Sequence, residues 1–290
     1  MSLSNWFETF NKSLWMSDTA ITNISYRYKR ITRQLNKDFW NTESETAHSW
    51  YVGSYGRDTD IHVSDIDMLY ELPYSVYEKY HGYSGNGQSA LLQAVKSSIE
   101  KTYKTSMKAD GQVIVISFTD GITFELVPAF ENTNGSYTYP DSNSGGNWKV
   151  TNPKPEIAEI KKKNNEWNKN LKRLARMARS WKDTWSVPMG GLLIDTMAYN
   201  FLQDWAYQDK SYIYYDWMSR DFFKFLSDQP ETQSYWYSPG ARQYVWKTGN
   251  FQAKAKKCYN LALEAIENEK DYPYSAKSKW REIYGTKFPS

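Results

Sequence analysis

Two acidic residues, Asp65 and Asp67, stand in residues 62–72, HVSDIDMLYEL, where polar and apolar residues alternate. Such alternation is typical of a half-buried β-strand. Alternate residues of a strand point to the same face, so we expect the two carboxylates to lie side by side. Neighbouring carboxylates repel one another unless a cation lies between them. The pattern therefore indicates either a solvated strand face or part of a site for a divalent cation.

A third acidic residue, Glu125, occurs among apolar residues in 122–130, ITFELVPAF. We expect this segment to form a hairpin with residues 111–118, joined by the turn Thr119-Asp120-Gly121. A carboxylate on a largely buried strand is costly unless it is paired or bound to a metal. Mg²⁺ commonly takes one or two carboxylates together with substrate phosphates. The acids on two strands therefore favour a metal site.

A Gly53-Ser54 pair lies just ahead of the acidic strand, in YVGSYGR. Glycine permits a close approach of backbone N–H groups to a phosphate, and the Ser54 hydroxyl adds a donor. A Gly-Ser pair alone indicates only a turn. Its position before Asp65 and Asp67 favours a phosphate-binding role.

Apolar spacing predicts a long helix over residues 17–46, capped by Ser17 or Asp18, and another helix over 88–103. Residues 131–155 are rich in Asn, Gly, Ser and Pro, which indicates a domain boundary or a functional loop. The rest of the chain is predicted to be helical, with helices over 155–185, 189–207, 220–228 and 250–271. The order of elements indicates an α+β protein whose second half is helical.

Composition excludes several classes of function. The 36 Lys and Arg against 33 Asp and Glu give a net charge of only +3, so no nucleic-acid activator is evident. A single cysteine excludes an internal disulfide, and three histidines without ligand spacing argue against a Cys/His zinc site. The first 15 residues do not have the pattern of a signal peptide, and no apolar stretch is long enough to cross a membrane. We therefore expect a cytoplasmic protein with no membrane partner.

The order G-S-Y-G-R-x-T, S-D-I-D and E-L-V-P-A resembles the polymerase-β-type nucleotidyltransferase superfamily. More narrowly, it resembles the CD-NTases, which are bacterial synthases of cyclic oligonucleotides related to animal cyclic GMP–AMP synthase and oligoadenylate synthase. Residues 138–153, 173–185, 187–202 and 279–289 also look like this family, so the resemblance extends over most of the chain from about Gly53.

The resemblance implies a bilobal, polymerase-β-like α+β fold. Residues 1–150 would form a catalytic lobe with a mixed β-sheet and a long spine helix, and residues 151–290 would form a helical lobe. It also implies a catalytic set of Asp65, Asp67 and Glu125 that holds two Mg²⁺ ions, for which Mn²⁺ can substitute. The family more often has Asp at the third position, and Glu125 is one methylene longer.

The resemblance further implies a set of nucleotide contacts: Gly53, Ser54 and Arg57, then Arg179 in place of a family Lys, with Lys182 as the alternative. The basic residues Arg173, Arg176, Arg179 and Lys182 recur at steps of three. Each such step drifts by about 60° around a helix, so at most two or three of them can face one triphosphate. A solvated helix face is the alternative interpretation of this series.

The activity implied is condensation of nucleoside triphosphates, ATP or GTP or both, into a cyclic di- or trinucleotide. This second messenger would trigger a separate effector protein in CBASS anti-phage defence. One alternative is a linear nucleotidyltransferase that acts on RNA or another acceptor. The other is a catalytically silent nucleotide-sensing module, although such a module usually lacks one of the acids and all three are present here.

Overall fold

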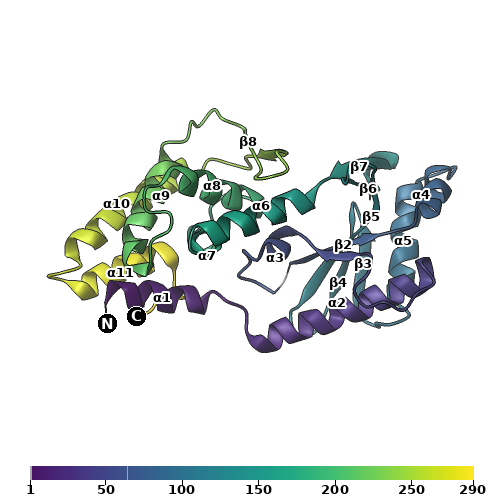
Figure 1. Ribbon diagram of the computed structural model, residues 1–290, viewed down its shortest axis with the longest axis horizontal. Helices are drawn as coiled ribbons and strands as arrows, with labels where there is room; N and C mark the ends of the chain where they lie inside the picture. Colours follow the sequence, from purple (N-terminus) through teal and green to yellow (C-terminus); the bar gives the residue numbers. More distant parts are fainter. Residues whose placement is uncertain (1, 64) are drawn as a thin grey trace. The chain divides into compact units, whose positions relative to one another are not determined.

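The computed structural model describes residues 2–63 and 65–290, and it divides the chain into two compact units (Figure 1). The sheet unit contains residues 16–56 and 62–154, and the helical unit contains residues 57–61, 155–290 and the N-terminal segment up to Trp15. The main boundary lies at 154/155, near the 150/151 that we expected. We expected residues 57–61 and the N-terminal segment to belong to the catalytic lobe, whereas they pack with the helical unit.

The long predicted helix of the sheet unit is α2, Asp18–Phe39. Ser17 caps it, since its hydroxyl accepts a hydrogen bond from the Ala20 N–H at 3.2 Å. The helix ends earlier than the predicted residue 46, because Asn41 takes a positive φ of 52°. Two shorter helices follow, α4 at Tyr74–His81 and α5 at Gly87–Ile99.

A seven-stranded mixed sheet forms the rest of this unit. Its strands are β1 Ser49–Tyr51, β2 Ile66–Glu71, β3 Ser106–Asp110, β4 Val113–Ser117, β5 Thr123–Glu131, β6 Tyr137–Asp141 and β7 Asn147–Thr151. The main order is β1-β2-β5-β4-β3, with β6 paired to β5 and β7 to β6. Only β2 and β5 run parallel among these pairs. The predicted β4–β5 hairpin is confirmed, whereas β6 and β7 lie in the segment that we expected to be a boundary or loop.

The packing of the sheet determines which of its faces carries the acids. Ile66 and Met68 of β2 belong to a buried cluster that also contains residues of α2 and α5. Because side chains alternate along a strand, Asp67 and Leu69 lie on the opposite face. Leu69 contacts a separate small cluster with Ala129 and Tyr137. The face that carries Asp67 is therefore not the one that α2 and α5 cover.

The helical unit contains helices α1 Leu3–Ser13, α7 Asn170–Trp185, α8 Gly191–Asp204, α9 Tyr215–Ser227, α10 Gln252–Asn268 and α11 Pro273–Tyr284. Helix α6, Pro153–Glu166, begins at the unit boundary. The predicted helix 155–185 is therefore two helices, because Asn168 and Lys169 have positive φ angles of 49° and 66° and break it. A small hairpin, β8 Tyr235–Tyr237 with β9 Tyr244–Trp246, was not predicted.

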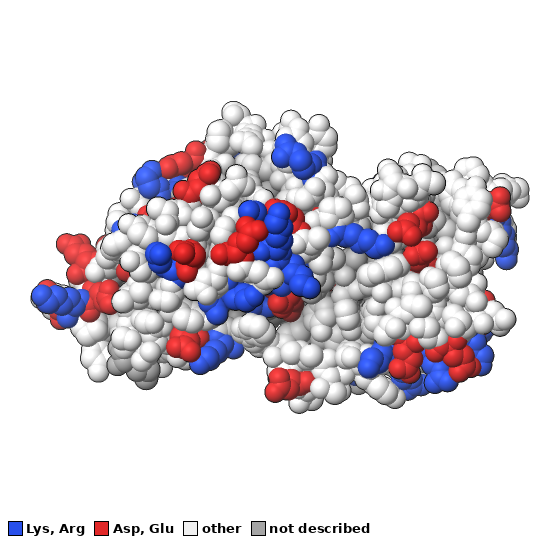
Figure 2. Space-filling model, in the orientation of Figure 1, with Lys and Arg blue, Asp and Glu red and all other residues white. Residues whose placement is uncertain are grey.

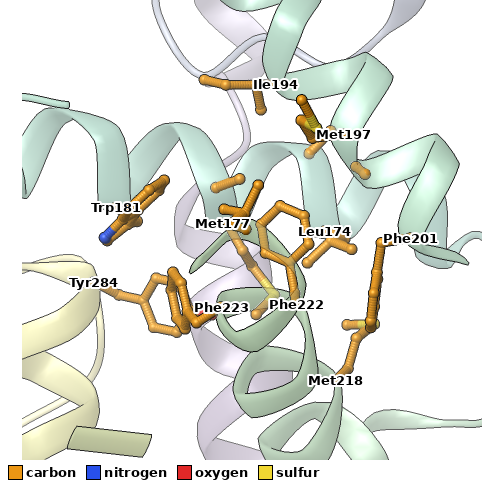
Figure 3. Packing of buried hydrophobic residues seen from close by; sticks show 14 of the residues in the cluster. Leu174, Met177, Trp181, Ile194, Met197, Phe201, Met218, Phe222, Phe223 and Tyr284 are labelled. Carbon is orange, nitrogen blue, oxygen red and sulfur yellow. The ribbon is translucent and has the colours of Figure 1, made fainter. Parts of the chain in front are cut away.

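The core of the helical unit is aromatic and sulfur-rich. Figure 3 shows Met177 and Trp181 of α7 between side chains of α8, α9 and α11. Cys258 is buried, and its sulfur accepts a hydrogen bond from the Trp181 indole N–H at 3.2 Å. Burial raises the pKa of this thiol to about 12, so it acts as a packed side chain. In the described part of the chain, no helix is both long and apolar enough to span a bilayer.

Replacement of Asn36 tests how α2 is tied to the sheet. This side chain is fully buried; it donates to the carbonyls of Ser44 at 2.8 Å and Ala47 at 2.9 Å and accepts from the Tyr70 hydroxyl at 3.1 Å. Asn36→Ala leaves these groups without a partner, and we expect the free energy of unfolding to fall by about 3 kcal/mol in urea titrations. Tyr70→Phe removes one of the bonds and should cost less. An equal loss in both variants would contradict this account.

Candidate active site

Strand pairing brings Asp67 and Glu125 together. β2 and β5 are parallel neighbours, and Asp67 is directly opposite Glu125 in their register. Their side chains therefore share the face away from α2 and α5. Asp65 lies just before β2 rather than within it, and it is exposed. Burial, and then the nearby charge of Asp65, raise the pKa of Glu125 above its ordinary value. Of the three predicted acids, Asp67 and Glu125 are therefore directly opposite one another, and Asp65 is close enough to Glu125 to affect its pKa.

Gly53 lies against Asp67 because β1 pairs with β2. Tyr51 is opposite Met68 in the antiparallel register, and the next N–H, that of Val52, donates to the Asp67 carbonyl at 3.0 Å. Gly53 then takes a φ of +59°, and a Cβ added there would lie 1.7 Å from Asp67 Oδ2. Only glycine fits this approach. The predicted turn is the start of a five-residue helix, α3, Gly53–Arg57.

The carboxylates fit a divalent cation that also binds a phosphate. Among residues 2–63 and 65–290, no three His, Cys, Asp or Glu side chains are grouped so that they could hold an ion alone. Mg²⁺ needs only one or two carboxylates when water and phosphate supply the other oxygens. Asp67 and Glu125 provide such a pair, and in the described structure no Lys or Arg is ion-paired with Glu125. The ion itself stays a prediction.

Two of the predicted nucleotide contacts, Arg57 and Arg179, converge instead on Asp195 of α8. The Arg179 guanidinium donates to both Asp195 carboxylate oxygens, at 2.6 and 3.0 Å. Arg57 Nε donates to Oδ2 at 2.8 Å, and the Thr59 hydroxyl donates to the same oxygen at 3.0 Å. Complete burial would raise the pKa of Asp195, but the charges of Arg179 and Arg57 outweigh it and lower that pKa.

A second acid completes this buried group. Arg57 Nη1 lies 3.8 Å from Glu156 Oε2, and both side chains are only 6% exposed. Burial raises the pKa of Glu156, and the charge of Arg57 acts in the opposite direction. The four residues Arg57, Arg179, Asp195 and Glu156, which we call the buried ionic cluster, all belong to the helical unit.

The basic residues of α7 do not form a solvated face. Arg176 is buried and donates to the Asp58 carbonyl at 2.9 Å, and its guanidinium lies 4.3 Å from the centre of the Trp15 ring. Arg173 lies over Tyr212 at 4.8 Å. Lys182 differs from them, since its side chain is 38% exposed and its nearest carboxylate, Asp183, is 3.9 Å away.

Charges of both signs are interspersed elsewhere on the surface. On the face shown in Figure 2, Lys and Arg groups lie beside Asp and Glu groups rather than in one continuous basic area. This distribution agrees with the small net charge of +3.

Sequence reasoning missed Asp195, although the sequence contains a signal for it. It stands in the apolar helix segment LLIDTMAY, and a charged residue inside such a segment needs a cationic partner. Arg57 and Arg179 are those partners, so their guanidinium groups are already engaged. Their contact with a nucleotide phosphate remains a prediction, as does that of Lys182.

A mixed sheet with acids on neighbouring parallel strands, followed by a helical unit, is the architecture of polymerase-β-like nucleotidyltransferases. Residues 1–164 match the family model described as the Second Messenger Oligonucleotide or Dinucleotide Synthetase (SMODS) domain. The chain therefore belongs to this family, that of the CD-NTases.

Individual relatives are distant in sequence but similar in fold. A probable cyclic nucleotide synthase of Bacillus cereus strain VD146 is 23% identical over 218 residues, which cover 69% of this chain and 63% of that protein. CdnG of Bradyrhizobium diazoefficiens, a CD-NTase solved in complex with GTP, superposes with a TM-score of 0.68 at 11% identity, covering 98% of this chain and 95% of CdnG. CdnC of E. coli MS115-1, solved with ATP, gives 0.62 at 14% identity, with coverage of 94% and 93%.

The raised pKa of Glu125 predicts a pH-dependent gain in stability when its charge is removed. A carboxyl whose folded pKa is raised stabilises the fold below its ordinary pKa, and this contribution is lost as the pH rises through the raised value. In metal-free buffer, Glu125→Gln should therefore melt at a higher temperature than the natural protein at about pH 8, and the difference should shrink toward about pH 4.

Glu131→Gln is the matched control for Glu125→Gln on the same strand. Its hydrogen bond and ion pair with Lys154 lower the pKa of Glu131, so its charge favours the fold. It should show no stabilisation at about pH 8. A Glu125→Gln protein that melts below the natural protein at every pH would contradict the electrostatic account.

Removal of Asp195 tests the buried ionic cluster. Asp195→Ala leaves the guanidinium groups of Arg57 and Arg179 buried without their shared carboxylate, and we expect a loss of about 3–5 kcal/mol in the free energy of unfolding. Asp195→Asn, which keeps the shape, should lose less. Asp209→Ala, an exposed acid in the same unit, serves as the control. A loss below about 1 kcal/mol for Asp195→Ala would show that the cluster does not stabilise the fold.

Proposed function

We propose that this protein is a Mg²⁺-dependent nucleotidyltransferase that joins nucleoside triphosphates into a cyclic oligonucleotide. The observation that carries the proposal is the register of Asp67 and Glu125 on two neighbouring parallel strands, with Gly53 in contact with Asp67. Membership of the SMODS family and the name of the Bacillus relative support the same reaction class.

Asp65, Asp67 and Glu125 are the residues that would hold the two Mg²⁺ ions. The bound ions would lower the pKa of the acceptor ribose hydroxyl and offset the charge of the leaving pyrophosphate. Glu125, the acid on the neighbouring strand, is the carboxylate that we assign to accept the proton of that hydroxyl. The ribose oxygen then bonds to the α-phosphorus of the second nucleotide, the α–β phosphoanhydride bond breaks, and pyrophosphate leaves.

Gly53 and Ser54 are the proposed contacts of the triphosphate. The absence of a Cβ at Gly53 lets its backbone approach the carboxylate of Asp67, where a phosphate bound to the same ion would lie. Arg57, the last residue of the helix that begins at Gly53, is held by Asp195. Asp195 therefore acts as a positioning residue for the Arg57 guanidinium. Lys182 is a better candidate for a phosphate contact than Arg179, whose guanidinium is occupied by Asp195.

The substrates and the product belong to the same proposal. CdnG was solved with GTP and CdnC with ATP, which supports a purine nucleoside triphosphate as the substrate here. A second round of transfer would close a cyclic dinucleotide, or a trinucleotide after one more addition. The product would act as a cytoplasmic second messenger on a separate effector protein in anti-phage defence.

Removal of the metal-binding acids tests this function. Asp65→Asn with Asp67→Asn should lower pyrophosphate release from mixed nucleoside triphosphates and Mg²⁺ by about a thousandfold or more. Asp110→Asn, an exposed acid of the same sheet, should leave the rate unchanged. Mass spectrometry should find phosphatase-resistant cyclic products with the natural protein. Unchanged release in the double variant would reject the site, and extended or labelled RNA would favour the linear alternative.

A further inference from the structure

The hairpin β8–β9 presents an aromatic face of four rings. Tyr235 is opposite Trp246 in the register, and Tyr237 is opposite Tyr244, so these four residues share one face of the hairpin. On the other face, Trp236 and Val245 are buried in the core of the helical unit. The hairpin is thus attached through one face and leaves its aromatic face outward.

The outward rings are in mutual contact yet remain accessible. Tyr235 meets Tyr244 edge-on at 4.6 Å and Trp246 at 5.3 Å between ring centroids. Tyr237, Tyr244 and Trp246 are 41%, 56% and 60% exposed. Exposure of so many contacting aromatic side chains is costly in water, and such patches commonly mark a binding site.

A cavity of about 570 Å³ adjoins this face. All three residues of β8, Tyr235, Trp236 and Tyr237, line it. The polar groups that line it include the amides of Asn200 and Gln233 and the guanidinium of Arg242. Asn200 belongs to α8, which contacts both strands of the hairpin. The cavity therefore offers flat apolar rings, hydrogen-bonding amides and a positive charge in one place.

Arg242 is the one charged side chain among the described residues that line this cavity. Its guanidinium lies 4.9 Å from the centre of the Tyr237 ring, and in the part of the chain that the structure describes no carboxylate forms an ion pair with it. An unneutralised guanidinium held by an aromatic ring suits an anion, and a phosphate is the anion that guanidinium groups bind best through paired hydrogen bonds.

The hairpin packs closely against the rest of the helical unit. The Trp236 indole N–H donates to Gln229 Oε1 at 3.2 Å, and its ring lies 6.0 Å from that of Phe251. In the loop of the hairpin, a Cβ added to Gly240 would lie 2.2 Å from the Pro155 carbonyl oxygen, so the loop packs closely against the start of α6. A preformed surface loses little conformational entropy when a ligand binds.

We propose that this aromatic face and its cavity bind a purine nucleoside triphosphate. The base would stack on the rings, as bases do on aromatic platforms that accept single nucleotides. Asn200 or Gln233 would hydrogen-bond the edge of the base, a pairing that side-chain amides make well with adenine. Arg242 would contact the phosphates. The inference rests on the proposed function in one respect, because it takes the ligand to be a substrate of the proposed nucleotidyltransferase reaction.

Equilibrium binding to the full chain tests the proposal. The probes are non-hydrolysable analogues of ATP and GTP, followed by calorimetry, and 8-azido-ATP, followed by mapping of the cross-linked peptides. Tyr244→Ala combined with Trp246→Ala should weaken binding by about tenfold or more, while Tyr244→Phe, which keeps the ring, should bind normally. Tyr274→Ala removes a tyrosine that is 89% exposed on α11 and is the matched control.

Arg242→Gln separates the phosphate contact from stacking. This variant should bind the triphosphate analogues several-fold more weakly than the natural protein does. It should bind adenosine with the same affinity as the natural protein. Cross-links should map to residues 232–246. All the substituted side chains are exposed or line an open cavity, and an unchanged melting temperature will verify that each variant is folded.

The result that overturns the inference is unchanged affinity in the double aromatic variant with cross-links outside residues 232–246. If pyrophosphate release also persists with an unchanged KM in that variant, the proposed function stands and the inference alone fails. A third outcome is that the natural protein binds the nucleotide analogues but releases no pyrophosphate, and that the double aromatic variant no longer binds them. In that case the inference stands and the proposed function fails.

Discussion

The parallel pairing of β2 with β5 is the constraint on which the candidate active site depends. It places Asp67 beside Glu125. A shift of the strand register by one residue would point the side chain of one of these acids into the core. The register is maintained by Ile66 and Met68 on the other face, which are buried against α2 and α5. Apolar packing on one side of the sheet therefore fixes a costly concentration of negative charge on the other.

Gly53 extends this arrangement to the adjoining helix. The β1–β2 pairing brings its backbone against the carboxylate of Asp67, at a distance that any side chain would prevent. The same chain segment ends in Arg57, whose guanidinium is held by the fully buried Asp195. A buried ion pair is seldom the most stable solution for a core, since desolvation opposes it. Its value here lies in orientation, because it fixes the guanidinium of Arg57 at the end of α3.

The aromatic hairpin shows a different use of strand alternation. Trp236 and Val245 bury one face, and the other face keeps four rings in reach of solvent beside Arg242. In the sheet unit the exposed alternate positions carry acids that suit a metal, and in the hairpin they carry rings that suit a base.

The sequence by itself determined the acids, the long helix with its Ser17 cap and the β4–β5 hairpin, because each depends on local periodicity and short-range turns. It also carried the resemblance to the CD-NTases, which the family match confirms. Only the tertiary structure decided that Arg57 and Arg179 converge on Asp195, and that residues 57–61 pack with the helical unit. Arg57 and Asp195 are 138 positions apart and Arg179 and Asp195 are 16 apart, and no local pattern specifies which buried carboxylate a basic residue will meet.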